Sequence, residues 1–114
     1  MSGRNYQNGL AAEDAATRAY TANGATLLHS RWRSAAGEID LIFRHGPLII
    51  FAEVKARKSH GAAANALSPK QSARLLASAE IYLSDHCPQG QDARFDLVMV
   101  DANARIEILE NCFQ

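Results

Sequence analysis

Apolar residues recur at two spacings along the chain, and the first of them is helical. Between Leu10 and Ala22 an alanine stripe repeats every three or four residues and marks one face of a helix: Ala12, Ala15, Ala16 and Ala19. Asn8 precedes the stripe and can cap a helix start, and Asn23 and Gly24 follow it with the left-handed conformation that ends one. The pattern predicts a first helix over residues 10–22.

Three extended segments follow, each short, apolar and rich in residues that favour strands. They cover residues 25–33, 37–43 and 47–55. Residues 44–46 are few enough to join the second and third segments as a β-hairpin. The pattern therefore predicts three strands in succession, with the last two antiparallel.

A second helix is indicated by its start signal. Ser68 can cap it, Pro69 suits the first helical position, and Gln71 suits the third. Its predicted core face has helical spacing and comprises Ser72, Leu75, Leu76, Ala79 and Leu83. Residues 59–67, which precede this helix, show no periodic pattern, so we expect a mobile loop there.

Two more strands complete the chain after a loop over residues 85–92. The first covers residues 94–100, and a turn over 101–104 leads to another strand around Ile106 and Ile108. The order helix, three strands, helix, two strands predicts an α/β fold. We expect a mixed central sheet of about five strands flanked by helices.

Length and composition describe a single globular unit. The 114 residues fit one domain spanning 1–114, and 47% hydrophobic with 21% charged residues is typical of a folded chain. The longest apolar run, Pro47 to Ala52, is too short to cross a bilayer, and the first five residues lack a secretion signal. We therefore expect a cytoplasmic protein without a membrane partner. Cys87 and Cys112 lack metal-ligand spacing.

Charge is distributed unevenly although the formal net charge is +0. Residues 29–74 hold eight Lys and Arg residues against three acids, whereas residues 75–114 hold two against seven. A basic middle segment suits a polyanionic partner such as nucleic acid. The alternative is that the two halves of the chain simply attract each other in the fold.

Charged side chains interrupt both strands of the predicted hairpin. Alternation puts Glu38 and Asp40 on one face of the first strand, and Glu53 and Lys55 on one face of the second. Pairing of residue 44 with residue 47 would place Glu38 opposite Glu53 and Asp40 diagonal to it. The three carboxylates would then lie within reach of one another, with an ammonium group beside them.

Clustered carboxylates repel one another, and a hard divalent cation relieves that repulsion. A Mg²⁺ or Mn²⁺ site with Lys55 beside it suits phosphodiester hydrolysis, because the cation activates water and the lysine stabilises the developing phosphate charge. The alternative is a set of ion pairs on a solvated sheet face, for example between Asp40 and Arg57. The spacing alone leaves both possibilities open.

Two motifs make the sequence similar to a known family. Residues 37–42 (GEIDLI) and 51–57 (FAEVKAR) resemble the YraN-like family of small bacterial proteins. The resemblance extends from Gly9 to about Val100 and includes further matching positions: Glu13, Tyr20, Arg31-Trp32-Arg33, Arg74-Leu75, Tyr82-Leu83 and Arg94-Phe95-Asp96. The chain departs from the family pattern at Ala52 and at His29-Ser30, and neither departure removes a candidate ligand.

The resemblance implies a restriction-endonuclease-like fold, similar to that of Holliday-junction resolvases. It implies that Asp40 and Glu53 are metal ligands, that Lys55 is the catalytic lysine, and that Glu13 is a further acidic ligand from the first helix. It also implies a homodimer, because a resolvase meets two scissile phosphates symmetrically. Candidate nucleic-acid contacts are the basic residues around this site: Arg31, Arg33, Arg57, Lys58, Lys70 and Arg74.

Two classes of function follow from these observations. The first is a metal-dependent endonuclease that hydrolyses phosphodiester bonds of DNA, with branched and flapped DNA as candidate substrates. The second is a non-catalytic nucleic-acid-binding or assembly module that retains the nuclease fold.

Overall fold

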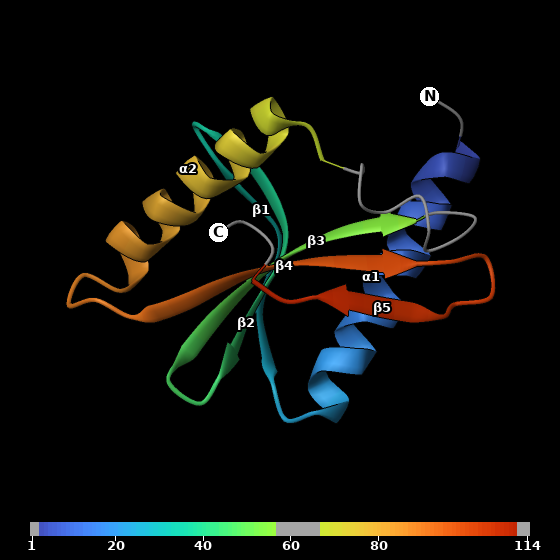
Figure 1. Ribbon diagram of the computed structural model, residues 1–114, viewed down its shortest axis with the longest axis horizontal. Helices are drawn as coiled ribbons and strands as arrows, with labels where there is room; N and C mark the ends of the chain where they lie inside the picture. Colours follow the sequence, from blue (N-terminus) through green and yellow to red (C-terminus); the bar gives the residue numbers. More distant parts are fainter. Residues whose placement is uncertain (1–2, 57–66, 112–114) are drawn as a thin grey trace.

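The computed structural model describes residues 3–56 and 67–111. Its elements follow one another in the predicted order (Figure 1): α1 (Gly3–Ala22), β1 (Thr26–Ser34), β2 (Gly37–His45), β3 (Leu48–Ala56), α2 (Pro69–His86), β4 (Asp92–Val100) and β5 (Ile106–Leu109). The predicted α/β class and element order are therefore confirmed. Arg57, Lys58 and nearly all of the loop expected over 59–67 lie outside the described residues.

One mixed five-stranded sheet joins all the strands in the order β1-β2-β3-β4-β5. Neighbouring strands are antiparallel except for β3 and β4, which are parallel. A parallel pair needs a crossover connection, and α2 lies within it. Within the described residues, neither helix combines the length and the apolar character needed to cross a membrane.

The two helices cover opposite faces of this sheet (Figure 1). The cluster under α1 joins its alanine stripe and Tyr20 to strand residues: Leu41, Phe43, Ile50, Ala52, Val98 and Val100. The cluster under α2 joins Leu75, Ala79 and Tyr82 to strand residues of the other face: Ile39, Ile42, Ile49, Phe51 and Phe95. Burial on both faces explains why the central strands are apolar almost throughout.

Helix α1 begins at Gly3, seven residues before the predicted start at Leu10. The predicted cap Asn8 therefore lies inside the helix and does not begin it. The prediction was wrong because it relied on the apolar stripe, whereas the segment before the stripe is polar but contains no proline to stop a helix. The predicted apolar face is confirmed by the burial of Ala12, Ala15 and Ala16.

Helix α2 begins as predicted. The Ser68 hydroxyl accepts a hydrogen bond from the Gln71 amide at 3.1 Å, and Pro69 occupies the first helical position. Its buried face differs from the predicted one by a small rotation and comprises Leu75, Ser78, Ala79 and Tyr82, whereas Leu76 is exposed. Aromatic packing explains the rotation, because Tyr82 meets both Trp32 and Phe51 edge-on.

The β2–β3 hairpin has a different register from the predicted one. His45 pairs with Leu48 and Arg44 with Ile49, so the turn consists of Gly46 and Pro47. Gly46 adopts a left-handed φ of 60°, a conformation that favours glycine and permits this tight turn. The predicted pairing of residues 44 and 47 was therefore wrong, and Glu38 does not lie opposite Glu53.

Strict alternation also fails in β2. Ile39 and Ile42 both pack in the cluster under α2, whereas Leu41 packs under α1. The predicted alternation, with Glu38 and Asp40 on one face and Ile39 and Leu41 on the other, was therefore wrong for Ile39 and Leu41. The irregularity coincides with the place where β2 stops pairing with β3, since the paired positions end at Leu41 and Ala52.

Candidate functional site

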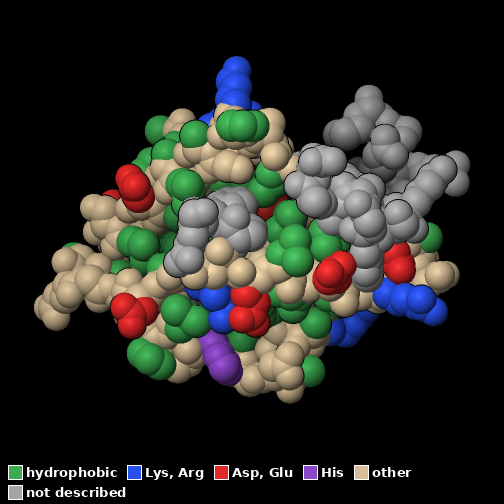
Figure 2. Space-filling view, in the orientation of Figure 1, with side chains coloured by type: hydrophobic (Ala, Val, Ile, Leu, Met, Phe, Trp, Pro, Cys, Tyr) green, Lys and Arg blue, Asp and Glu red, His purple; other side chains and the backbone are tan. Residues whose placement is uncertain are grey.

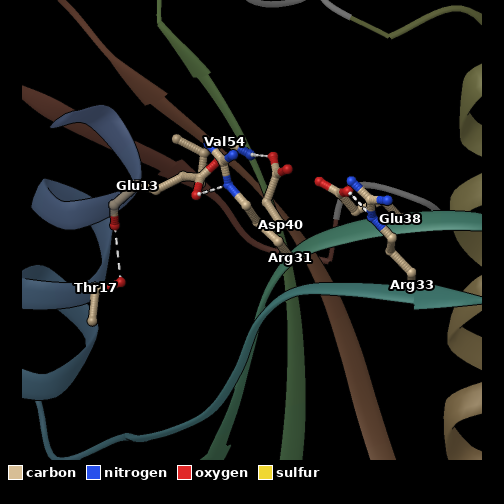
Figure 3. A network of polar contacts seen from close by, with 7 residues as sticks. All are labelled: Glu13, Thr17, Arg31, Arg33, Glu38, Asp40 and Val54. Carbon is tan, nitrogen blue, oxygen red and sulfur yellow. Dashed lines mark hydrogen bonds and ion pairs between the residues drawn. The ribbon is translucent and has the colours of Figure 1, made fainter. Parts of the chain in front are cut away.

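Asp40 lies where strands β2 and β3 separate. Its Oδ2 accepts a hydrogen bond from the backbone amide of Val54 at 2.9 Å (Figure 3). Asp40 lies one residue, and Val54 two residues, beyond the last paired positions, Leu41 and Ala52. A side-chain carboxylate therefore takes the place of a strand carbonyl as the acceptor. This bond fixes the Asp40 carboxylate beside the segment that carries Glu53 and Lys55.

Glu53 is the least satisfied of the buried acids. The residue is only 8% exposed, and its Oε2 lies 3.7 Å from the Lys55 ammonium. Its Oε1 is buried and has no hydrogen-bond partner. An unpartnered buried carboxylate oxygen is destabilising, so its presence calls for a functional explanation.

The electrostatic surroundings favour the protonated form of Glu53. Burial raises its pKa to about 8, and the charge of Asp40 acts in the same direction. The Lys55 ammonium opposes this shift but is outweighed. A bound cation would reverse the balance, because its positive charge stabilises both carboxylates in their ionised form.

Glu13 reaches toward the same region from α1 but is held by Arg31 of β1. The guanidinium donates two hydrogen bonds to the carboxylate, from Nε to Oε1 at 3.0 Å and from Nη2 to Oε2 at 3.3 Å. Figure 3 shows the Arg31 guanidinium between the Glu13 and Asp40 side chains. Burial raises the pKa of Glu13 and the charge of Asp40 adds to the rise, whereas Arg31 lowers it.

Arg31 has an unusual backbone conformation for a residue within a strand. Its φ is 53°, in the left-handed region that non-glycine residues rarely adopt. Such strain persists only where the surrounding structure compensates for it, and it is frequent at functional sites. The pairing of Glu13 with Arg31 was not predicted, because nothing in the sequence signals a left-handed arginine in a strand.

The other basic candidates differ in their surroundings. Arg33 is exposed and donates a hydrogen bond from Nε to Glu38 Oε2 at 3.0 Å, so Glu38 is part of an edge pair (Figure 3). Lys70 and Arg74 are exposed on the first half of α2. The Arg74 side chain approaches Gly37, at the start of β2, so it lies near the Arg33–Glu38 pair.

The structure thus brings together Asp40, Glu53 and Lys55. Within residues 3–56 and 67–111, no group of three or more His, Cys, Asp and Glu side chains is arranged as a metal site, since Glu13 faces Arg31. The two carboxylates nevertheless fit a hard divalent cation, because the orphaned Oε1 of Glu53 offers a free oxygen ligand beside Asp40.

Comparison with known proteins places the chain in a family. The sequence profile of the uncharacterised protein family UPF0102 matches residues 12–100. A UPF0102 protein of Cereibacter sphaeroides is 47% identical over 99% of this chain and 98% of its own length. A UPF0102 protein of Ruegeria is 47% identical over 92% of this chain and 86% of its own, and one of Azorhizobium caulinodans is 39% identical over 96% and 84%. The chain therefore belongs to UPF0102, the YraN family that its motifs resemble.

Proposed function

We propose that the protein is a metal-dependent endonuclease that hydrolyses phosphodiester bonds of DNA. The observation that carries the proposal is the buried Glu53 carboxylate, whose Oε1 lacks a partner while Asp40 and Lys55 lie beside it. A purely structural site would satisfy that oxygen with a hydrogen-bond donor. A site for a divalent cation leaves it available.

Asp40 and Glu53 would hold Mg²⁺ or Mn²⁺, with Glu13 as a further candidate ligand from α1. The bound cation would supply Lewis acidity, which lowers the pKa of water and screens the charge of a phosphate. The Val54 amide holds Asp40 in place, so the ligand is positioned by the backbone of the neighbouring strand.

Lys55 would act on the scissile phosphate. Its side chain is 19% exposed and its Nζ lies 3.7 Å from Glu53, so the ammonium sits at the edge of the carboxylate site. An ammonium there can stabilise the negative charge that develops on the phosphorane oxygens and can orient the attacking water. This position supports a role for Lys55 as a transition-state stabiliser.

Exposed basic residues support a polyanionic substrate. Arg33, Lys70 and Arg74 are exposed, and Arg57 and Lys58 come two and three residues after Lys55 in the sequence. By contrast, the face formed by β4 and β5 carries acidic side chains spread over it, with Lys and Arg side chains mainly at its margins (Figure 2). We propose that DNA, with branched and flapped forms as first candidates, approaches Asp40 and Lys55 and avoids the β4–β5 face.

Cleavage assays test this proposal. We expect the purified protein to nick linear, flapped or four-way DNA in Mg²⁺ or Mn²⁺ and to lose this activity with EDTA. Lys55→Ala should reduce the cleavage rate at least about 100-fold, because a donor aimed at developing charge contributes on that scale. DNA affinity, measured by fluorescence anisotropy, should change less than about threefold.

Arg18→Ala is a matched control, since this exposed residue of α1 pairs only with Asp14 among the ion pairs of the described residues. It removes one solvent-exposed positive charge and should leave cleavage intact. Absence of cleavage on every substrate with both metals would contradict the nuclease proposal.

A second function is a non-catalytic nucleic-acid-binding or assembly module. The exposed basic residues favour it, because they need no cation to hold phosphates. It predicts salt-dependent DNA binding with no cleavage under any condition. We also propose a homodimer, which sedimentation equilibrium would test.

A further inference from the structure

The Arg31–Glu13 pair lies beside the carboxylate site, and the chemistry proposed above gives Arg31 no role. We propose that Arg31 couples substrate binding to assembly of the metal site: a backbone phosphate of DNA takes the guanidinium from Glu13, and the released carboxylate joins Asp40 and Glu53. This inference rests on the proposed nuclease function. It adds a coupling between the binding of DNA and the binding of the divalent cation.

The contacts of Arg31 make this exchange possible. The guanidinium binds the Glu13 carboxylate through two nitrogens, and a phosphate accepts the same two-pronged contact. The Arg31 side chain is 34% exposed while that of Glu13 is 15% exposed, so an incoming anion meets the arginine first. One bidentate acceptor can therefore replace the other without loss of hydrogen bonds to the guanidinium.

The charges on either side of the exchange also balance. While Arg31 holds Glu13, those two charges cancel, and the site proper contains only Asp40, Glu53 and Lys55. After release, three carboxylates and one ammonium leave an excess of two negative charges when all are ionised, which a divalent cation neutralises. A third carboxylate without the cation would instead be repelled by Asp40.

The backbone of Arg31 shows that its orientation is imposed by the fold. A left-handed φ of 53° turns this residue out of the regular strand pattern, and its side chain then meets α1. The conformation costs free energy in a non-glycine residue. The contrast with Arg33 is direct, because Arg33 makes a similar Arg–Glu contact with Glu38 from a regular backbone at an exposed edge.

The coupling is reciprocal by thermodynamic necessity, so it can be measured from either ligand. From the metal side, we expect Arg31→Gln to raise Mn²⁺ affinity about 5- to 20-fold in calorimetric titrations without DNA. The substitution removes the partner of Glu13 and so mimics phosphate binding. Arg33→Gln, which disrupts the other pair, should change Mn²⁺ affinity less than about twofold.

A double-mutant cycle separates ligation by Glu13 from a simple field effect of the lost positive charge. In the Glu13→Gln background, Arg31→Gln should no longer raise Mn²⁺ affinity. If it raises the affinity equally in both backgrounds, Glu13 does not enter the site and the inference is overturned. Arg31→Lys keeps the charge but loses the bidentate fork, so it should give an intermediate affinity. Circular dichroism and thermal melts verify that each variant is folded.

From the DNA side, anisotropy with a labelled duplex at constant ionic strength should show several-fold tighter binding when Mn²⁺ is present. The same gain should be absent in Glu13→Gln, which also corrects for direct effects of Mn²⁺ on the duplex. Mn²⁺ binding without this linkage would overturn the coupling alone. Absence of Mn²⁺ binding to any variant, including the wild type, would overturn the coupling and the metal-dependent function together.

Discussion

Two buried carboxylates on neighbouring strands have opposite surroundings. Asp96 of β4 is fully buried and accepts four hydrogen bonds: from Tyr20 Oη at 2.7 Å, Arg94 Nε at 2.9 Å, Arg94 Nη2 at 3.0 Å and the Asn111 amide at 3.0 Å. Glu53 of β3 is almost as deeply buried, yet its Oε1 has no partner and Lys55 lies 3.7 Å from its Oε2. Both oxygens of the Asp96 carboxylate therefore accept hydrogen bonds, whereas one oxygen of the Glu53 carboxylate accepts none.

The difference separates structure from function. The bonds to Asp96 link α1, β4 and the segment after β5, so this carboxylate holds elements together. Glu53 contacts only its near neighbour Lys55 among the ion pairs of the described residues and is costly to ionise, which is a poor arrangement for stability and a good one for binding a cation. We infer that the fold tolerates the unsatisfied Glu53 carboxylate because the hydrogen bonds to Asp96 help to stabilise the molecule.

The largest expected effect on stability comes from substitution of Asp96. Asp96→Ala should lower the free energy of unfolding by about 3–5 kcal/mol, because the Tyr20 hydroxyl and the Asn111 amide lose their acceptor. Among the ion pairs of the described residues, the largely buried Arg94 guanidinium keeps only its longer contact with Glu110, at 3.6 Å. Urea denaturation measures this loss. Asp14→Ala, which removes a solvated partner of Arg18, should change stability by less than about 0.5 kcal/mol. A loss below about 1 kcal/mol for Asp96→Ala would contradict the structural role.

Substitution of Glu53 should instead stabilise the protein, by an amount that depends on pH. Because the pKa of Glu53 is raised to about 8 in the folded state and is near 4.5 in the unfolded chain, the folded protein keeps a proton that unfolding releases. Stability should therefore fall as the pH rises from about 4.5 to 8, and Glu53→Gln should remove this dependence. At about pH 8.5 without metal, we expect Glu53→Gln to be more stable than the wild type by about 2–4 kcal/mol.

Denaturation curves at several pH values test this prediction. The two proteins should be nearly equal in stability at about pH 4.5, since Glu53 is then protonated in the folded state and the glutamine resembles it. A wild-type protein that is more stable than Glu53→Gln at high pH would show that the carboxylate is satisfied after all.

The smallest of these effects concerns one bond to Asp96. Tyr20→Phe removes the hydroxyl but keeps the ring that stacks on Phe43 at a centroid distance of 4.4 Å. We expect a loss of about 2 kcal/mol, the usual contribution of a hydrogen bond to a charged group. In the Asp96→Ala background the same change should cost much less, because the bond is already absent. Additive losses would mean that the Tyr20 hydroxyl stabilises the fold in another way.

Much of the architecture could be predicted from local patterns. Strand-forming runs predicted all five strands, and the Ser68-Pro69 signal predicted the start of α2. The early start of α1 and the rotated face of α2 could not be predicted, because the first lacks an apolar stripe and the second depends on which aromatic side chains meet across the sheet. The sequence offers Arg94 or Arg105 as an ion-pair partner of Asp96, and the structure pairs Asp96 with Arg94; the additional bond from Tyr20 was not predicted.

The candidate site was predicted only in part. The motifs indicated Asp40, Glu53 and Lys55, and the structure brings these side chains together, although through a register other than the predicted one. In the predicted hairpin Glu38 faced Glu53, but in the structure it pairs with Arg33. The catalytic and metal-binding roles of these residues remain predictions that the assays above test.

The sequence by itself determined which segments form helices and strands, which faces are apolar, and which residues could supply acid and amine chemistry, because these properties depend on spacing and residue type alone. Only the tertiary structure decided that Asp40 takes the Val54 amide where two strands separate, that Arg31 holds Glu13, and that Asp96 is satisfied while Glu53 is not. These outcomes depend on register, backbone irregularity and contacts between distant segments. No local pattern encodes them, since each is settled by how the helices and strands pack against one another.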